Sequence, residues 1–164
     1  MQTWRSKLGQ GSVVLQTLPT HHATGLNINT VPFLMAGGTV EFATPKFDAA
    51  AIWERFRQRG ITAFSAVPTI FVRLIKYWDE SLSKLEEPQR NTYLEGLRAI
   101  QQFHCGSAAL PGYASRKWSE LCGGRYIMER YGGTEFGNPF LNLPDMPYIP
   151  VSGIIMCLFT CWFC

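Results

Sequence analysis

The chain has 164 residues, of which 46% are hydrophobic and only 16% are charged. This composition is typical of a globular domain with a sizeable apolar core. The formal charge of +3 comes from scattered Lys and Arg without a dense basic run, so we expect no nucleic acid among the partners.

The cysteines and the first residues indicate the compartment. Five cysteines are present, and an odd number argues against a disulfide framework. Residues 1–11 are polar and lack the apolar core and small-residue cleavage site of a signal peptide. We therefore expect an intracellular protein, cytoplasmic or mitochondrial, with reduced thiols.

Strand and helix patterns alternate through the first half of the chain. Residues 12–18 form a β-branched and apolar run, which predicts a buried strand followed by a loop over 19–25. An apolar pattern over 26–35 favours a helix in spite of Pro32, and residues 39–43 alternate as a short strand.

The same alternation continues toward the C-terminus. Asp48 is a natural N-cap for a helix that ends at Gly60. Further predicted elements are a strand over 61–67, a helix over 69–78, a helix with its apolar stripe over 93–100, a strand over 100–104, a helix over 113–121 and a strand over 125–129. This order predicts an α/β fold with a mostly parallel sheet.

Two loops of small residues each follow a predicted strand, at 106–109 and at 131–137. Since ligands bind at the carboxyl ends of strands in open α/β sheets, we expect both loops on one rim. Their N–H groups could bind phosphate, Tyr131 could stack on a purine, and Glu135 could bind Mg²⁺ beside the Thr134 hydroxyl. From the residues alone, two ordinary turns and a surface carboxylate are the simpler interpretation, because Gly-rich loops are common.

Four motifs in a fixed order carry a family resemblance. They are LPTHHATGL at 18–26, AVPTIF at 66–71, GSAALP at 106–111 and ERYGGTE at 129–135. Together they resemble the AMP-dependent synthetase and ligase superfamily of adenylate-forming enzymes, most closely its malonyl-CoA synthetases. The resemblance implies that residues 12–145 are part of an AMP-binding N-terminal domain with strands and helices alternating around a mostly parallel sheet.

The resemblance also implies roles for individual residues. Thr134 and Glu135 would be catalytic, with Glu135 also the Mg²⁺ ligand, and His22 and Arg130 would bind substrate. The implied nucleotide-binding residues are Gly106, Ser107, Ala108, Ala109, Glu129, Tyr131, Gly132, Gly133 and Thr134. Arg130 would face the distal carboxylate of malonate through a bidentate fork, and an Arg that snorkels at a strand end is an equally weighted alternative.

The implied reaction uses ATP, Mg²⁺, CoA and a small carboxylic acid. The carboxylate attacks the α-phosphate of ATP to give an acyl-adenylate, and the CoA thiol then displaces AMP. We find no phosphate-gripping Ser/Thr/Gly loop before residue 18, and no ribose-binding Asp, hinge or C-terminal lysine domain after the signature motif. We therefore expect a fragment that is inactive without the remainder of the synthetase, and a non-catalytic relic that binds nucleotide or acyl groups is the alternative.

Smaller departures concern single positions and the tail. Thr24, Cys105 and Gly133 stand where the malonyl-CoA synthetases tend to have His, Ser, and Met or Leu. Residues 146–164 leave the family pattern in an apolar, Cys-rich run that is too short to span a bilayer. We interpret this tail as a gene-model artefact such as translated intron, with membrane attachment as the minority alternative.

Overall fold

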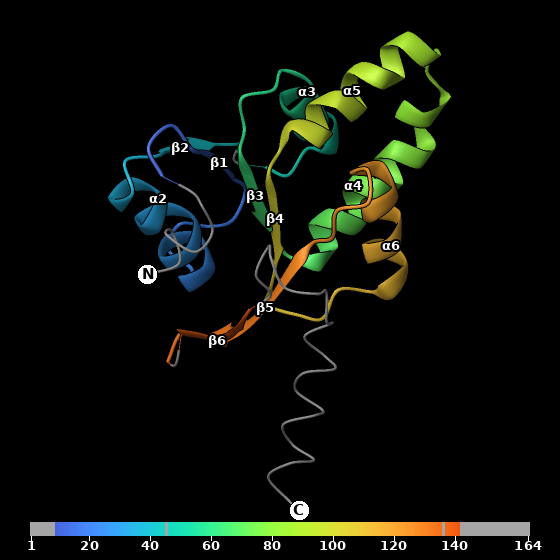
Figure 1. Ribbon diagram of the computed structural model, residues 1–164. Coiled ribbons are helices and arrows are strands. Elements are labelled where there is room, and N and C mark those ends of the chain that lie inside the picture. Colours follow the sequence, from blue (N-terminus) through green and yellow to red (C-terminus); the bar gives the residue numbers. More distant parts are fainter. Residues whose placement is uncertain (1–8, 45, 136, 142–164) are drawn as a thin grey trace, which may run out of the picture.

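The computed structural model describes residues 9–44, 46–135 and 137–141, the last range by its backbone only. Within them, six strands form one sheet in the order β2-β1-β3-β4-β5-β6 (Figure 1). The strands are β1 Val13–Gln16, β2 Thr39–Phe42, β3 Ala63–Ala66, β4 Gln102–Cys105, β5 Met128–Gly133 and β6 Gly137–Leu141. Strands β1 to β5 are parallel and β6 is antiparallel to β5, which confirms the predicted α/β fold with a mostly parallel sheet.

Helices cover the two faces of this sheet unequally. Those of the described residues are η1 Thr24–Thr30, α2 Val31–Met35, α3 Ala49–Arg57, α4 Pro68–Glu80, η2 Leu82–Lys84, α5 Glu87–Ala99 and α6 Gly112–Leu121. Helices α3 to α6 lie together on one face, whereas η1 and α2 lie on the other (Figure 1). No helix in the described part of the chain is both long and apolar enough to cross a membrane.

Local sequence signals explain several helix ends. The Asp48 carboxylate accepts hydrogen bonds from the N–H groups of Ala50 and Ala51 at 2.8 and 3.2 Å, which confirms the predicted N-cap of α3. Pro68 occupies the first position of α4, where a missing N–H costs no hydrogen bond. Helix α3 ends at Arg57, three residues before the predicted stop at Gly60.

Two stretches differ from the predictions. The expected single helix over 26–35 begins earlier, at Thr24, and consists of the π-helical turn η1 followed by α2. Pro32 cannot donate to the carbonyl of Ile28, which favours a change of hydrogen-bond pattern at this point. Strand β5 starts three residues later than predicted and runs through Gly133, so the expected loop over 131–137 is in fact a hairpin with β6.

An aromatic core fills the space between the sheet and helices α3 to α6. Trp118 packs edge-on against Phe71 and Phe103, with ring centroids 5.0 and 5.5 Å apart, and Phe64 packs in the same way on Phe56 and Phe71. Each such pair contributes about 0.5–1.5 kcal/mol beyond its buried area. This core fixes β3 and β4, whose carboxyl ends carry part of the site.

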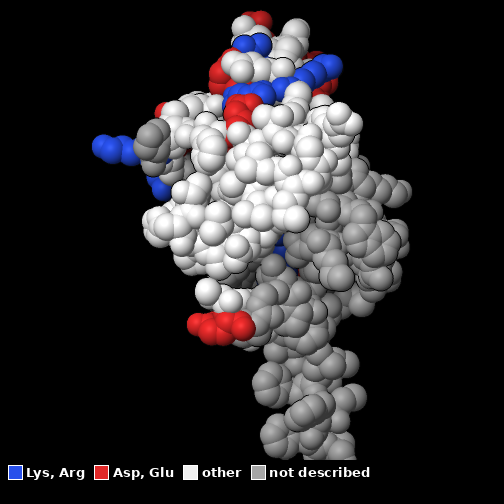
Figure 2. Space-filling model, turned by 90° about the vertical axis from the view of Figure 1, so that its left-hand side faces the viewer, with Lys and Arg blue, Asp and Glu red and all other residues white. Residues whose placement is uncertain are grey.

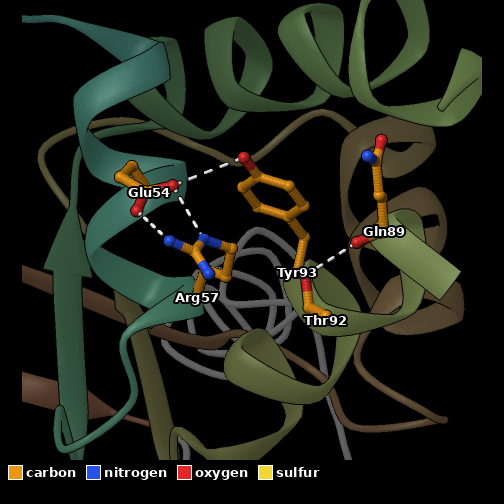
Figure 3. A network of polar contacts seen from close by, with 5 residues as sticks. All are labelled: Glu54, Arg57, Gln89, Thr92 and Tyr93. Atoms are coloured by element: carbon orange, nitrogen blue, oxygen red, sulfur yellow. Dashed lines mark hydrogen bonds and ion pairs between the residues drawn. The ribbon is translucent and has the colours of Figure 1, made fainter.

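Helices α3 and α5 pack closely because α5 has no side chain at the crossing. A Cβ atom on Gly96 would lie 2.2 Å from the Phe56 carbonyl oxygen and 2.7 Å from the Arg57 Cα. Beside this contact Glu54 accepts hydrogen bonds from Arg57 and Tyr93, which joins the two helices (Figure 3). The Arg57 partner lowers the pKa of Glu54, so this carboxylate stays ionised in the network.

Candidate functional site

A cavity of about 400 Å³ opens at the carboxyl ends of β3, β4 and β5. It lies between η1 with its preceding loop and the hairpin of β5 and β6. The cavity is lined by His22, Ala23, Thr24, Asn27, Ile28, Ser65, Cys105, Gly106, Ser107, Arg130, Gly132, Gly133, Thr134 and Glu135. Parallel α/β sheets commonly bind ligands at this edge, and both loops predicted to share one rim do meet there.

The first wall of the cavity is held by a glycine of the LPTHHATGL motif. The Gly25 carbonyl accepts hydrogen bonds from Gln16 Nε2 at 2.7 Å and from the Thr30 hydroxyl at 2.8 Å. A Cβ atom on Gly25 would lie 2.1 Å from the Pro19 carbonyl oxygen, so a larger residue would displace the chain here. The motif glycine therefore fixes the loop that brings His22 to the cavity.

The second wall is the loop that follows β4. Ser107 has a φ of 71°, in the left-handed region that non-glycine residues seldom adopt. A Cβ atom on Gly106 would lie 3.4 Å from the Arg130 carbonyl oxygen and 3.7 Å from the Arg130 Cβ. The absence of a side chain at Gly106 thus allows β5 to pass close to this loop and leaves backbone at the cavity surface.

Arg130 is half-buried and places a positive charge in the cavity wall. Its Nη1 atom is buried and has no hydrogen-bond partner among the described residues. Burial lowers the pKa of Arg130 to about 10, so the guanidinium is still charged at neutral pH. A buried guanidinium N–H without an acceptor is costly, and an anionic ligand that reached it would offset that cost.

Thr134 and Glu135 form the turn that connects β5 to β6. Both line the cavity, and the Glu135 side chain is exposed at its mouth. A carboxylate and a hydroxyl are oxygen donors of the kind that Mg²⁺ accepts, with phosphate and water as further ligands. The residues present therefore fit a Mg²⁺ ion that is held jointly with a phosphate group.

Four of the predicted nucleotide-binding residues lie outside the cavity lining. Ala108 and Ala109 are exposed on the loop after β4, and Tyr131 is 42% exposed on the hairpin. Glu129 is buried on the opposite face, where its Oε2 atom accepts a long hydrogen bond from the Leu110 N–H at 3.5 Å. Its contact with Leu110 indicates that Glu129 holds the loop in shape, and the contact of all four residues with nucleotide stays a prediction.

Sequence patterns had not singled out several other cavity residues. Ser65 lies on β3 and Asn27 on η1, and neither belongs to a recognised motif. Cys105, noted above only as a departure from the family pattern, also lines the cavity, and burial followed by the nearby Glu129 charge raises the pKa of its thiol to about 12. The only available signal for Ser65 was its place near the carboxyl end of a predicted strand.

Comparison with known proteins gives the family of this site. The family model described as AMP-binding enzyme matches residues 1–160, which is nearly the whole chain. The chain belongs to the AMP-binding enzyme family. This result confirms the resemblance carried by the four motifs.

Named relatives of this family member are CoA ligases. A probable CoA ligase from Humulus lupulus is 36% identical over 74% of this chain and 21% of its own length. The mitochondrial malonate–CoA ligase of Homo sapiens is 33% identical over 87% of this chain and 26% of its own length. The chain thus spans about a quarter of the length of these curated relatives.

Solved structures show the same fold. ATP-bound MatB from Rhodopseudomonas palustris has a TM-score of 0.71 and 26% identity, and covers 90% of this chain and 26% of its own. A malonyl-CoA ligase described as a ternary product complex with methylmalonyl-CoA and AMP has a TM-score of 0.75 at 24% identity, with 90% and 30% of the two chains covered. The sheet and helices described above are therefore part of the fold shared by these enzymes.

Proposed function

We propose that this chain forms the acyl-adenylate part of an AMP-forming CoA ligase for a short dicarboxylic acid such as malonate. The observation that carries the proposal is the buried, unpartnered Nη1 atom of Arg130 in the wall of the cavity. A monocarboxylic acid with an apolar tail would leave this charge unpaired, whereas a second carboxylate would pair with it. The sequence similarity to malonate–CoA ligases supports the same substrate class.

In this proposal the acid lies along the cavity with its two carboxylates at opposite ends. The distal carboxylate binds Arg130, and His22 borders the acyl group from the opposite wall. The reacting carboxylate then points toward the turn of Thr134 and Glu135, where the α-phosphate of ATP would lie. Attack on that phosphate forms the acyl–phosphate bond of the adenylate and releases pyrophosphate.

The nucleotide would lie on the loop after β4 and on the hairpin. The backbone at Gly106 and Ser107 is open to the cavity, and Tyr131 offers an exposed ring on which adenine could stack. Mg²⁺, when bound, would neutralise charge on the phosphates. Glu135 would hold the ion, and the Thr134 hydroxyl would donate a hydrogen bond to phosphate.

The test compares two acids that differ by one carboxylate. We expect the 164-residue chain to bind malonate at least about tenfold more tightly than propanoate in isothermal titration calorimetry with AMP present, because a charged hydrogen bond contributes about 1.5–3 kcal/mol. Arg130→Met removes the buried charge and should abolish this preference. Arg116→Met on the exposed face of α6 is the matched control and should keep it.

Catalysis is tested separately, in a chimera with residues 12–135 in place of the matching segment of MatB. The chimera should exchange pyrophosphate into ATP in a malonate-dependent manner, and Arg130→Met should reduce that exchange. Equal binding of malonate and propanoate by the unaltered chain would contradict the dicarboxylate assignment. Malonate binding without exchange in the chimera would favour a binding protein that retains only the pocket.

A further inference from the structure

His104 is a buried histidine next to the cavity that has no role in the reaction described above. It lies on β4 and its side chain is buried, with Nε2 3.2 Å from the Gln102 Oε1 atom. The other ring nitrogen, Nδ1, is buried and has no hydrogen-bond partner among the described residues. Burial first, and then the nearby Arg130 charge, hold the pKa of His104 well below its usual value.

The register of the sheet places His104 between two cavity residues. It pairs with Ser65 on β3 and with Met128 on β5, and Arg130 follows Met128 by two positions. Since side chains alternate between the faces of a strand, Ser65, His104 and Arg130 all lie on the face that η1 covers. Ser65 and Arg130 line the cavity, and His104, which does not line it, is buried next to Ser65 on the same face.

Two buried polar atoms without partners among the described residues therefore lie on one face of the sheet. They are His104 Nδ1 and Arg130 Nη1, and each is a group that native proteins normally satisfy. With Gln102 accepting a hydrogen bond from Nε2–H, the neutral ring presents a lone pair at Nδ1. The ring proton is assigned to Nε2 because the Gln102 oxygen can only accept a hydrogen bond.

A carboxylate bound at Arg130 changes the charge around His104. Before binding, the guanidinium opposes protonation of the ring. After binding, the carboxylate neutralises that charge, and its own negative charge favours the protonated ring over the neutral one. Ligand binding and protonation of the ring then favour one another.

We propose that His104 is a proton-coupled specificity residue, so that an acid whose distal carboxylate binds Arg130 enters together with one proton. The proposal rests on the proposed function, in which Arg130 binds that carboxylate. The proton comes from solvent, the new bond is Nδ1–H, and no other bond changes. A monocarboxylic acid places no charge there and binds without the proton.

Few other groups could take up this proton. Gln102 on the same strand and Ser65 on β3 do not titrate near neutral pH, and Arg130 is already charged. Residues 24–35 of η1 and α2 contain no acidic, basic, His, Cys or Tyr residue. His22 and Glu135 line the same cavity and are exposed, so they are the groups against which His104 must be distinguished.

Calorimetry of the full 164-residue chain measures the coupling directly. Malonate is titrated at pH 7.5 in phosphate, HEPES and Tris, whose different ionisation enthalpies report the protons taken up per ligand bound. We expect a clear fraction of one proton for malonate and none for propanoate. His104→Asn should bind malonate more weakly and without proton uptake, whereas His22→Gln should retain the uptake whatever its affinity.

Ring resonances of the unaltered chain give a second measurement if His104→Asn does not fold. The chain has three histidines, and His21 and His22 are exposed, so the buried ring is readily distinguished. We expect its apparent pKa to rise toward neutrality with saturating malonate and to stay low with propanoate.

The outcomes separate this inference from the proposed function. Malonate binding without proton uptake, uptake that persists in His104→Asn, or a ring resonance that malonate does not shift would overturn the role of His104 and leave the dicarboxylate assignment standing. Failure to bind malonate at all would overturn both.

Discussion

The two faces of the sheet differ in how much covers them and in what they bury. On the face of α3 to α6, aromatic and aliphatic side chains fill one large core, in which Trp53, Phe56 and Trp118 are fully buried. Among the described residues the opposite face carries η1 and α2, and the buried apolar cluster there consists of Val14, Phe33 and Ala63. Several of its buried side chains are polar, including Gln16, Ser65 and His104.

The outer surface shows the same contrast. Leu34, Met35 and Phe42 are 57%, 84% and 62% exposed on and beside α2. Most of the described surface in the view onto this side is uncharged; charged side chains gather mainly at the top, with an acidic group near the bottom and a basic one at the left edge (Figure 2). One face thus supplies stability through apolar packing, and the other keeps polar groups and space for a ligand.

The largest expected loss of stability is at Gly96, where α5 crosses α3 on the side of the large aromatic core. Gly96→Ala would force a Cβ atom against the backbone of α3, because the Phe56 carbonyl oxygen would be 2.2 Å away. We expect the free energy of unfolding to fall by about 3 kcal/mol or more. Urea unfolding followed by tryptophan fluorescence measures this change.

Gly112→Ala is the matched control for this substitution. Its Cβ atom would meet only the end of the Arg116 side chain, at 3.4 Å. We expect a change within about 0.5 kcal/mol. Equal losses in the two variants would show that the contact between α3 and α5 is looser than the structure indicates.

Gly25 lies on the cavity face. Its substitution should destabilise the chain less than that of Gly96 but should weaken malonate binding. Gly25→Ala would bring a Cβ atom within 2.1 Å of the Pro19 carbonyl oxygen, in a loop that has more freedom to move than a helix crossing. We expect about 2 kcal/mol of destabilisation, with malonate affinity reduced at least tenfold. A variant that lost stability but kept its affinity would contradict the role of Gly25 in positioning the wall of the cavity.

The smallest expected change in stability concerns Cys122, which follows the end of α6 and belongs to the large core. Burial raises the pKa of its thiol to about 12 from 9.0 in the unfolded chain, so the folded protein holds the proton more tightly. The contribution of this thiol to the free energy of unfolding is fully present below pH 9 and is lost as the pH rises from 9 toward 12. Between pH 8 and pH 10 we expect a loss of about 1.4 kcal/mol from it.

Cys122→Ala removes this contribution and leaves that of other groups. The free energy of unfolding of the unaltered chain should therefore fall more steeply over this pH range than that of the variant. Parallel curves for the two proteins would mean that the Cys122 thiol is accessible to solvent in the folded state.

Much of the sheet could be predicted because its signals are local. Asp48 caps α3, apolar runs mark β1 and β3, and helix patterns separate the strands, so their parallel direction could be predicted. The boundaries of β5 could not be predicted in this way. Tyr131 and the two glycines after it are typical of a loop, but pairing with β6 holds them in a strand.

The candidate site was predicted in part. Motif wording identified Arg130, Thr134 and Glu135, and all three line one cavity. Ser65 was missed because a serine in an apolar strand carries no motif. The tail at 146–164 and its interpretation lie outside the described residues and remain a prediction.

The sequence by itself determined the alternation of strands and helices, the residues of the motifs and, through their order, the family. These features depend on neighbours along the chain or on a few invariant chemical requirements, such as a glycine where two backbones meet. Tertiary structure decided which face of the sheet became a dense core, and it placed His104 on the same face as Arg130, on the neighbouring strand, although twenty-five residues separate them. Burial and the proximity of distant groups set the charge state of a side chain, and neither can be seen until the chain is folded.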